Sequence, residues 1–244
     1  MKQGGTRALA LTAIVGTWLF TVTWLVAPLW QDHYRPLDRP VSDMGALTAH
    51  LPGVLNAACI VWGVAIAACA AAVHRALRPG PWRSAAVASL ALAAVSMVVI
   101  GLARLDCSDI ASRACFESWR AGRLSWHHEA HLWASTGCQL GLSLSSLAVA
   151  GFLRSRRSLV ALVPLAGGLL GLLAVVSPFF SEPRFDPHAH YGLYQRLGLL
   201  TSAGWIVLLA AAVLMRLDRR RAASPWPSAA PPRWSAAHPT RPSA

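Results

Sequence analysis

Six runs of about twenty residues in this chain contain no Asp, Glu, Lys or Arg. They cover residues 8–30, 51–73, 84–103, 132–153, 158–181 and 197–215. The hydrocarbon core of a bilayer is about 30 Å thick and is crossed by roughly 20 apolar helical residues, so each run is long enough to span it. The sequence therefore predicts an all-α, polytopic membrane protein: a bundle of six transmembrane helices arranged as three hairpins.

The charged residues indicate which way this bundle faces. If the chain threads back and forth, nine of the ten acidic residues and seven of the nine histidines lie in the loops of one face. On the other face lie 14 of the 22 lysines and arginines. Because lysine and arginine concentrate in cytoplasmic loops, we expect both termini in the cytoplasm. The net charge of +12 then reflects anchoring to membrane lipids, not nucleic-acid binding.

We expect residues 1–7 to form a short cytoplasmic N-terminus and residues 8–221 to form the membrane domain. The first run is longer than the apolar segment of a signal peptide, and no small-residue cleavage site follows it, so we interpret it as an uncleaved span. Beyond residue 221 the composition changes to Ala, Pro, Ser and Arg, with six prolines. This composition predicts a disordered cytoplasmic tail over residues 222–244.

Two of the five cysteines share the second outer loop. Cys107 and Cys115 would lie in an oxidising compartment, where a disulfide persists. A disulfide between them is therefore expected; two reduced thiols or a soft metal site are the alternatives, and no CxxC spacing supports the metal. The other three cysteines lie within the predicted spans, where a lone thiol behaves as a small hydrophobic side chain.

Polar motifs gather where the predicted spans meet the outer face. Ser42 and Asp43 precede Met44 and Gly45, an arrangement typical of a helix N-cap or a tight turn. Asp106 follows the third run, and His127, His128 and His131 precede the fourth. In a helix, His131 shares a face with either of the other two histidines, and both spacings suit a shared metal. A hydrogen-bonded belt of histidines at the membrane surface is the alternative interpretation.

A third polar segment leads into the sixth run. It contains Asp186, His188 and His190, followed by Tyr191, Tyr194 and Arg196. An arginine at membrane depth is costly unless it is paired or reaches the surface, so we expect Asp43 or Asp106 to pair with Arg196. A purely structural ion pair explains this arginine nearly as well as a functional role does.

These landmarks together resemble a bacterial family of six-span membrane proteins known as domain-of-unknown-function family 998. The resemblance rests on the segment from Ser42 to Gly45, Asp106, a histidine (His127 or His128) that opens the fourth span, and the segment from Gly192 to Arg196. It covers roughly residues 8–216. It implies the six-span topology and a bacterial cytoplasmic (inner) membrane. It also singles out these residues, and it supplies no reaction.

Two classes of function fit this pattern. The first is a metal-assisted hydrolase or transferase that acts on a lipid-type or small apolar substrate at the outer leaflet. A divalent metal such as zinc would lower the pKa of its bound water to about 7 and create a nucleophile. The predicted catalytic residues are Asp43, Asp106, His127, His128 and Arg196; the predicted metal ligands are His128, His131, His188 and Asp106. Ser42, Tyr191 and Tyr194 would orient these groups.

The second class is a non-enzymatic protein for membrane binding, sensing or transport assistance. Its outer histidines would respond to pH near their usual pKa of about 6.5. A membrane-embedded terpene cyclase, with aromatic residues and outer carboxylates around a carbocation, is a further alternative. The sequence does not indicate the oligomeric state.

Overall fold

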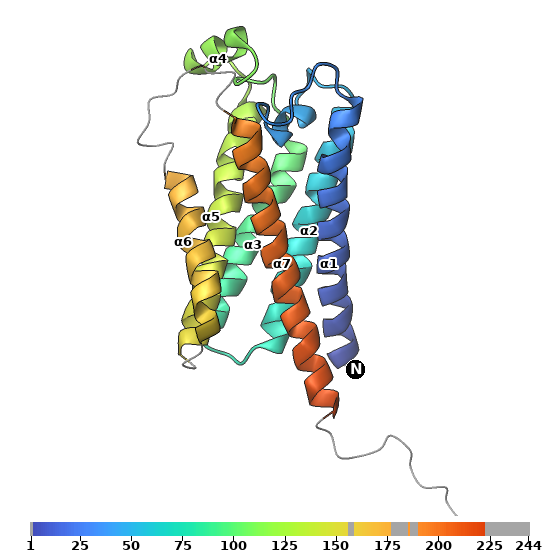
Figure 1. The fold of residues 1–244 in the computed structure, drawn as a ribbon, viewed down its shortest axis with the longest axis vertical. Coiled ribbons are helices and arrows are strands. Elements are labelled where there is room, and N and C mark those ends of the chain that lie inside the picture. The colour runs from blue at the N-terminus through green and yellow to red at the C-terminus, as the bar shows by residue number, and fades with distance from the viewer. Residues whose placement is uncertain (1, 156–158, 177–184, 186–189, 223–244) are drawn as a thin grey trace, which may run out of the picture.

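The structure, a computed structural model, describes residues 2–155, 159–176, 185 and 190–222 of the 244-residue chain. Helices form most of this part, which contains no strand. The long helices lie side by side along one axis, and the short α4 covers one end of the bundle, here called the α4 end (Figure 1). The α-helices are α1 (Lys2–Val26), α2 (Pro52–Ala76), α3 (Pro81–Leu102), α4 (Arg113–Arg120), α5 (Trp126–Arg154), α6 (Leu162–Val176) and α7 (Tyr191–Ala222). The 3-10 helices are η1 (Ala27–Trp30), η2 (Val41–Gly45) and η3 (Leu159–Ala161).

Five of these helices are long and apolar enough to cross a membrane: α1 with η1, α2, α3, α5 and α7. The prediction of a helical, multi-pass membrane protein is confirmed. The fifth uncharged run, 158–181, gives η3 and α6, and α6 has only 15 residues. A helix of that length is about 22 Å long, shorter than the hydrocarbon core. The sixth span therefore stays a prediction, and residues 177–181 lie outside the described part.

The order of packing follows the chain and then closes on itself. α1 packs on α2, α2 on α3, α3 on α5, and α5 on α6, while α7 returns to pack on α1 and α2. An ion pair of 2.8 Å between Arg7 and Asp218 joins the start of α1 to the last turns of α7. These two helix ends lie together, opposite the α4 end (Figure 1). Which side of the membrane they occupy stays a prediction, and the predicted tail lies outside the described residues.

Small residues let α2 and α3 approach closely. A Cβ atom added to Gly101 would lie 2.6 Å from the carbonyl oxygen of Asn56, and one added to Gly63 would lie 2.9 Å from that of Ala94. Helices in a bilayer associate through such close packing because lipid tails are as apolar as the helix surface. The tightly packed core carries one large aromatic pair, in which Phe20 of α1 stacks on Trp62 of α2 with ring centroids 4.3 Å apart.

Candidate functional site

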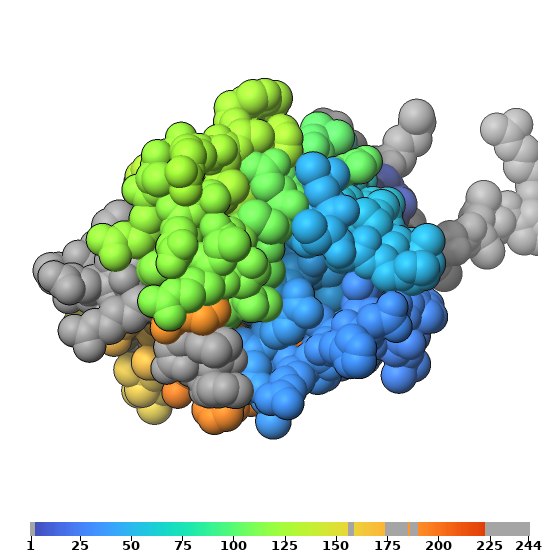
Figure 2. Space-filling model, turned by 90° about the horizontal axis from the view of Figure 1, so that it is seen from above, coloured from blue at the N-terminus to red at the C-terminus, as the bar shows by residue number. Residues whose placement is uncertain are grey.

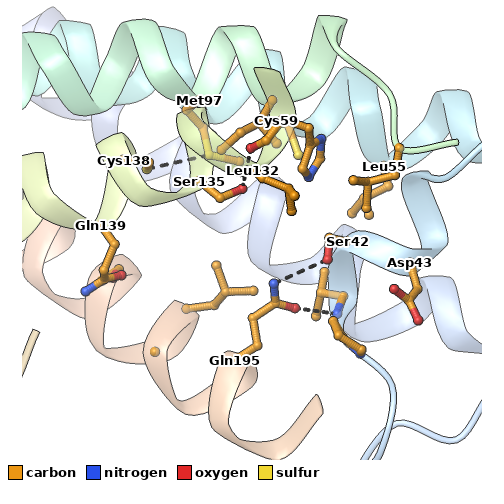
Figure 3. A pocket seen from close by; sticks show the side chains of 18 of the residues that line it. Ser42, Asp43, Leu55, Cys59, Met97, Leu132, Ser135, Cys138, Gln139 and Gln195 are labelled. Atoms are coloured by element: carbon orange, nitrogen blue, oxygen red, sulfur yellow. Dashed lines mark hydrogen bonds between the residues drawn. The ribbon is translucent and has the colours of Figure 1, made fainter. Parts of the chain in front are cut away.

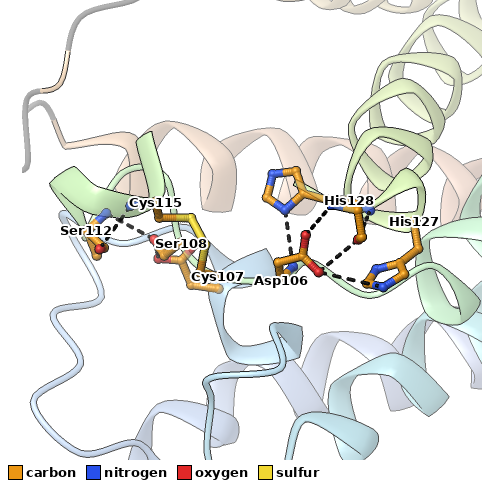
Figure 4. Close-up of a disulfide and its surroundings, with 10 residues drawn as sticks. Asp106, Cys107, Ser108, Ser112, Cys115, His127 and His128 are labelled. Atoms are coloured by element: carbon orange, nitrogen blue, oxygen red, sulfur yellow. Dashed lines mark hydrogen bonds and ion pairs between the residues drawn. A yellow bond between two sulfur atoms is a disulfide. The ribbon is translucent and has the colours of Figure 1, made fainter. Parts of the chain in front are cut away.

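A disulfide holds the loop between α3 and α5, which contains α4, at the α4 end of the bundle. Cys107 and Cys115 are bonded, with Cα atoms 6.1 Å apart, so the predicted disulfide is present (Figure 4). Cys115 lies in the first turn of α4, where its backbone N–H donates to the N-cap hydroxyl of Ser112 (3.3 Å). The disulfide therefore fixes the position of α4 relative to the end of α3. Seen from this end, the loop lies beside residues 27–50, and the start of α7 is visible next to both (Figure 2).

Asp106 organises the start of α5. Its carboxylate accepts hydrogen bonds from the backbone N–H (2.7 Å) and the hydroxyl (2.8 Å) of Ser125, the N-cap residue of α5. His127 Nε2 lies 3.6 Å from the same carboxylate, and the Asp106 N–H donates to His128 Nδ1 (3.2 Å; Figure 4). Burial alone would raise the pKa of Asp106, but the hydrogen bonds from Ser125 outweigh it and hold the pKa below its usual value. This network anchors the helix terminus.

Beneath this network a pocket of about 490 Å³ opens between α2, α3, α5 and α7 (Figure 3). Along α5 it extends from His131 to Leu142, about 16 Å at 1.5 Å per residue, which is about half the thickness of a hydrocarbon core. Its deep part is apolar and includes the stacked Phe20 and Trp62. Its polar lining residues are Ser42, Asp43, Asn56, Asp109, His131, Ser135, Gln139, Tyr191, Tyr194, Gln195 and Ser202.

The helix η2 forms one wall of the pocket and is held from two sides. Gln195 of α7 accepts a hydrogen bond from the N–H of Val41 and donates to the Ser42 hydroxyl (3.5 Å; Figure 3). Asn56 of α2 donates to the carbonyl of Gly45 (3.1 Å). A Cβ atom at Gly45 would lie 2.7 Å from the Asn56 amide oxygen, so a larger residue at this position would displace the Asn56 amide.

Asp43 of η2 is buried beside the pocket, with 2% of its side chain exposed. Its Oδ2 accepts hydrogen bonds from the hydroxyl of Ser108 (2.6 Å) and from Arg39 Nε (3.2 Å). Burial raises the pKa of Asp43, and the contacts with Ser108 and Arg39 offset this only in part. Burial also raises the pKa of Asp109, whose negative charge in turn raises the pKa of Asp43. Two aspartates that both resist ionisation thus line one pocket.

His131 presents a free nitrogen to the same pocket. Its Nδ1 lies 2.8 Å from the carbonyl oxygen of Ala103. Because a carbonyl can only accept, Nδ1 carries the proton, and in the neutral ring Nε2 keeps its lone pair. That Nε2 is buried and has no hydrogen-bond partner, while the residue lines the pocket and is only 4% exposed. A buried acceptor without a partner is costly unless a ligand or a water meets it.

Arg196 has different partners from those predicted. Instead of pairing with Asp43 or Asp106, its guanidinium donates to the Tyr34 hydroxyl (2.9 Å) and to the carbonyl of Arg39 (3.1 Å). It also donates to the carbonyls of Pro36 and Gly192 and lies over the rings of Trp24 and Tyr34. The expected pairing is wrong because Arg39 occupies Asp43, and Ser125 and His127 surround Asp106. Arg196 holds the loop before η2 against α7.

The amino-acid sequence places the chain in a known family of proteins. A family model described as protein of unknown function (DUF998) matches residues 14–212 of the chain. The chain belongs to this family. The resemblance inferred from the motifs is therefore confirmed, and the DUF998 match covers every pocket-lining residue, all of α2, α3, α5 and α6, and part of α1 and α7. No curated protein and no solved structure matches the chain.

The pocket contains some of the residues predicted for a DUF998 site and excludes others. Ser42, Asp43, His131, Tyr191 and Tyr194 line it. The network of Asp106, His127 and His128 lies at the start of α5, and Arg196 lies in the loop contact described above. His188 is outside the described residues. No three His, Cys, Asp or Glu side chains within the described ranges are grouped so that they would hold a metal ion.

Several lining residues were not predicted from the sequence. Asn56 is a lone amide in an otherwise apolar run, which was the signal for it. Ser135 and Gln139 follow His131 at steps of four residues. This spacing predicts a polar stripe on one face of the fourth helix, which was the signal for these two residues. Asp109 had no sequence signal, because only the folded loop brings it to the pocket.

The raised pKa of Asp109 gives a testable dependence of stability on pH. Because folding raises this pKa, the carboxyl stabilises the fold most below its unfolded value of about 3.9, and this contribution is lost as pH rises through the folded value. We expect Asp109→Asn to remove that loss and to raise the Tm at pH 7 by about 2–4 °C, the shift for about 1 kcal/mol. Thermal unfolding in detergent from pH 4 to 7 measures it. The exposed Asp32→Asn is the control, and an equal pH slope in wild type and Asp109→Asn would contradict the assignment.

Proposed function

We propose that this protein binds a lipid-type amphiphile in the pocket at its outer face and acts on it as a hydrolase or transferase through general acid–base catalysis. The observation that carries the proposal is the buried, unpartnered Nε2 of His131 in a pocket shared with Asp43 and Asp109. Ligand sites are typically concave and mostly apolar, with a few polar groups that orient the ligand, and they measure roughly 300–1,000 Å³. The pocket of about 490 Å³ fits that description.

The residues have distinct roles in this proposal. His131 Nε2 is the general base, since it alone offers a buried lone pair to the pocket. Asp43 or Asp109, whose pKa values are raised, supplies the proton as general acid. Titratable groups with perturbed pKa values in a cleft are characteristic of catalytic sites. Asp106, His127, His128 and Arg196 are positioning residues, because their contacts hold the start of α5 and the loop before η2.

A metal-assisted form of the reaction has less support from the described side chains. Asp106 uses both carboxylate oxygens for Ser125. His128 accepts the Asp106 N–H at Nδ1 and has an unpartnered Nε2, but it does not line the pocket. Of the four predicted ligands, His131 has a free nitrogen that faces the pocket. We therefore propose the acid–base chemistry without a metal step. We also propose that the α4 end faces the exterior of a bacterial cytoplasmic membrane, with both termini inside, as the positive charges at the opposite end favour.

The aromatic lining favours a second candidate, a membrane-embedded cyclase for an isoprenoid chain. The stacked Phe20 and Trp62 lie in the deep part of the pocket, and the faces of aromatic rings stabilise cations. A protonated Asp43 or Asp109 would start the reaction by protonating a double bond. A chain rearranged without any cleaved or transferred group would favour this candidate over hydrolysis.

Filling the pocket tests the proposed function. Gly198 lines the pocket, and a Cβ atom there meets nothing within 4 Å, so a larger side chain has room without disturbing the helix. We expect Gly198→Phe to weaken binding of a single-chain amphiphile at least tenfold while the Tm changes little. Binding is measured in nanodiscs by the ligand-induced rise in Tm, and turnover by mass spectrometry of the extracted lipid.

Gly204 on the same helix supplies the matched control. A Cβ there also meets nothing within 4 Å, but Gly204 is exposed and lies outside the pocket. Gly204→Phe should bind like wild type. If both variants bind equally well, the pocket is not the binding site. If Gly198→Phe blocks binding but wild type never alters the ligand, the protein is a binding protein without enzymatic activity.

A further inference from the structure

We propose that the pocket selects amphiphiles whose head group donates hydrogen bonds, a hydroxyl or an ammonium group, and rejects those with a phosphate or carboxylate head. This inference rests on the proposed function, because it names the substrate class of the same pocket. It follows from the charges that face the pocket, from the arginines that do not, and from the free nitrogen of His131.

The charged side chains at the pocket are of one sign. Asp43 and Asp109 line it, whereas none of its described lining residues is a lysine or an arginine. An anionic head group placed here would find no lysine or arginine in the described lining to pair with, and a charge buried without a partner is strongly unfavourable. A donor or a cation would instead hydrogen-bond to the carboxyl oxygens of Asp109 and favour its ionised form. The net charge of +12 for the whole chain thus gives the wrong sign for this site.

The two arginines nearest η2 are already bound to other groups. Arg39 donates to Asp43 (3.2 Å) and lies over the Tyr34 ring. Arg196 donates to the Tyr34 hydroxyl and to backbone carbonyls, and it stacks near Trp24. Recognition of a phosphate or carboxylate usually needs an arginine with free N–H donors. Freeing either side chain for an anionic ligand would break the contacts that hold the loop before η2.

The unpartnered nitrogen sets the position of the head group. His131 Nε2 is a buried acceptor, because Nδ1 donates to the Ala103 carbonyl. It lies in the first two turns of α5, while the apolar residues Met97, Cys138 and Leu142 line the pocket further in. A single-chain amphiphile therefore fits with its donor head at His131 and its chain directed toward the middle of the bundle.

Binding of matched probes to the full chain in nanodiscs tests the selectivity. Four probes share a dodecyl chain and carry an amine, a glycerol, a carboxylate or a phosphate head. Specific binding is the rise in Tm for wild type minus that for Gly198→Phe. We expect the amine and glycerol probes to bind at least tenfold more tightly than the carboxylate and phosphate probes.

Variants separate the two kinds of donor head. His131→Phe keeps a ring of similar shape without the acceptor and should weaken the glycerol probe at least fivefold, whereas His131→Gln restores an acceptor and part of the affinity. If His131→Phe does not fold, the four-probe series in wild type and the Asp109→Asn variant still test the selectivity. Asp109→Asn should weaken the amine probe more than the glycerol probe.

The outcomes also distinguish this inference from the proposed function. Equal specific binding of all four probes, or tighter binding of the anionic ones, would overturn the head-group selectivity and leave the pocket as the binding site. No Gly198-sensitive binding of any probe would overturn both.

Discussion

Replacing Arg196 with lysine is expected to lower the free energy of unfolding by about 2–3 kcal/mol, although the positive charge is kept. Arg196 donates to the Tyr34 hydroxyl and to the carbonyls of Pro36, Arg39 and Gly192. A hydrogen bond to a charged group contributes about 1.5–3 kcal/mol to the free energy of unfolding. Lysine has three donors on one nitrogen and cannot reproduce the planar fork of the guanidinium or its stacking over Trp24 and Tyr34.

Unfolding by SDS, followed by far-UV circular dichroism in detergent, measures the effect of Arg196→Lys. The matched control is Arg104→Lys, because Arg104 is exposed at the same end of the bundle. We expect the control to change the free energy of unfolding by less than about 0.5 kcal/mol. A small effect of Arg196→Lys, equal to that of the control, would show that charge alone holds the loop before η2.

The contacts of Arg196 also show why the site was only partly predictable from sequence. The uncharged runs predicted the membrane helices, since the length and polarity limits of a bilayer leave few alternatives. The same reasoning identified Asp43 and His131 as polar groups at helix ends. Which groups pair with one another depends on loop conformation, and the chain offered several acids of equal merit for Arg196. The partners it found are mostly backbone carbonyls, which every residue carries.

The roles of the three neighbouring histidines were also only partly predictable from the sequence. His127, His128 and His131 are close in sequence, and their helical spacing suited a shared metal. In the structure the Nδ1 atoms of His127 and His131 face different backbone carbonyls, and that of His128 accepts the N–H of Asp106. The pocket lining on α5 begins at His131, about one helical turn beyond His127 and His128, so His131 is the one of the three that lines it. Spacing alone therefore could not say which ring faces the pocket.

The sixth predicted span is described only up to residue 176. The run 158–181 is as apolar as the others, and η3 and α6 lie within it. Gly168 and Gly171 let α6 lie against Ser143 and Leu147 of α5. The number of spans therefore stays a prediction from the sequence.

Adding a single methyl group at Gly101 is expected to lower the stability of the fold and to weaken ligand binding in the pocket. The Cβ atom of Gly101→Ala would lie 2.6 Å from the Asn56 carbonyl oxygen and from Ile60 Cγ1, so α2 and α3 must move apart. Such overpacking costs about 1–3 kcal/mol, and we expect a value near the top of that range because one of the opposing atoms is backbone. Unfolding by SDS measures the loss of stability.

The position of Asn56 connects this packing to the site. Its side chain holds η2 through the Gly45 carbonyl (3.1 Å), and both Asn56 and η2 line the pocket. A displaced α2 should therefore also weaken binding of the amphiphile in Gly101→Ala, beyond what partial unfolding explains. Gly53 is the control position, because it lies on α2, the helix that carries Asn56. The methyl group added by Gly53→Ala meets nothing within 4 Å. Stability and binding should therefore stay unchanged or rise slightly, since helix propensity favours alanine. If Gly101→Ala lost stability but bound the ligand normally, the contact between Asn56 and η2 would have no part in shaping the pocket.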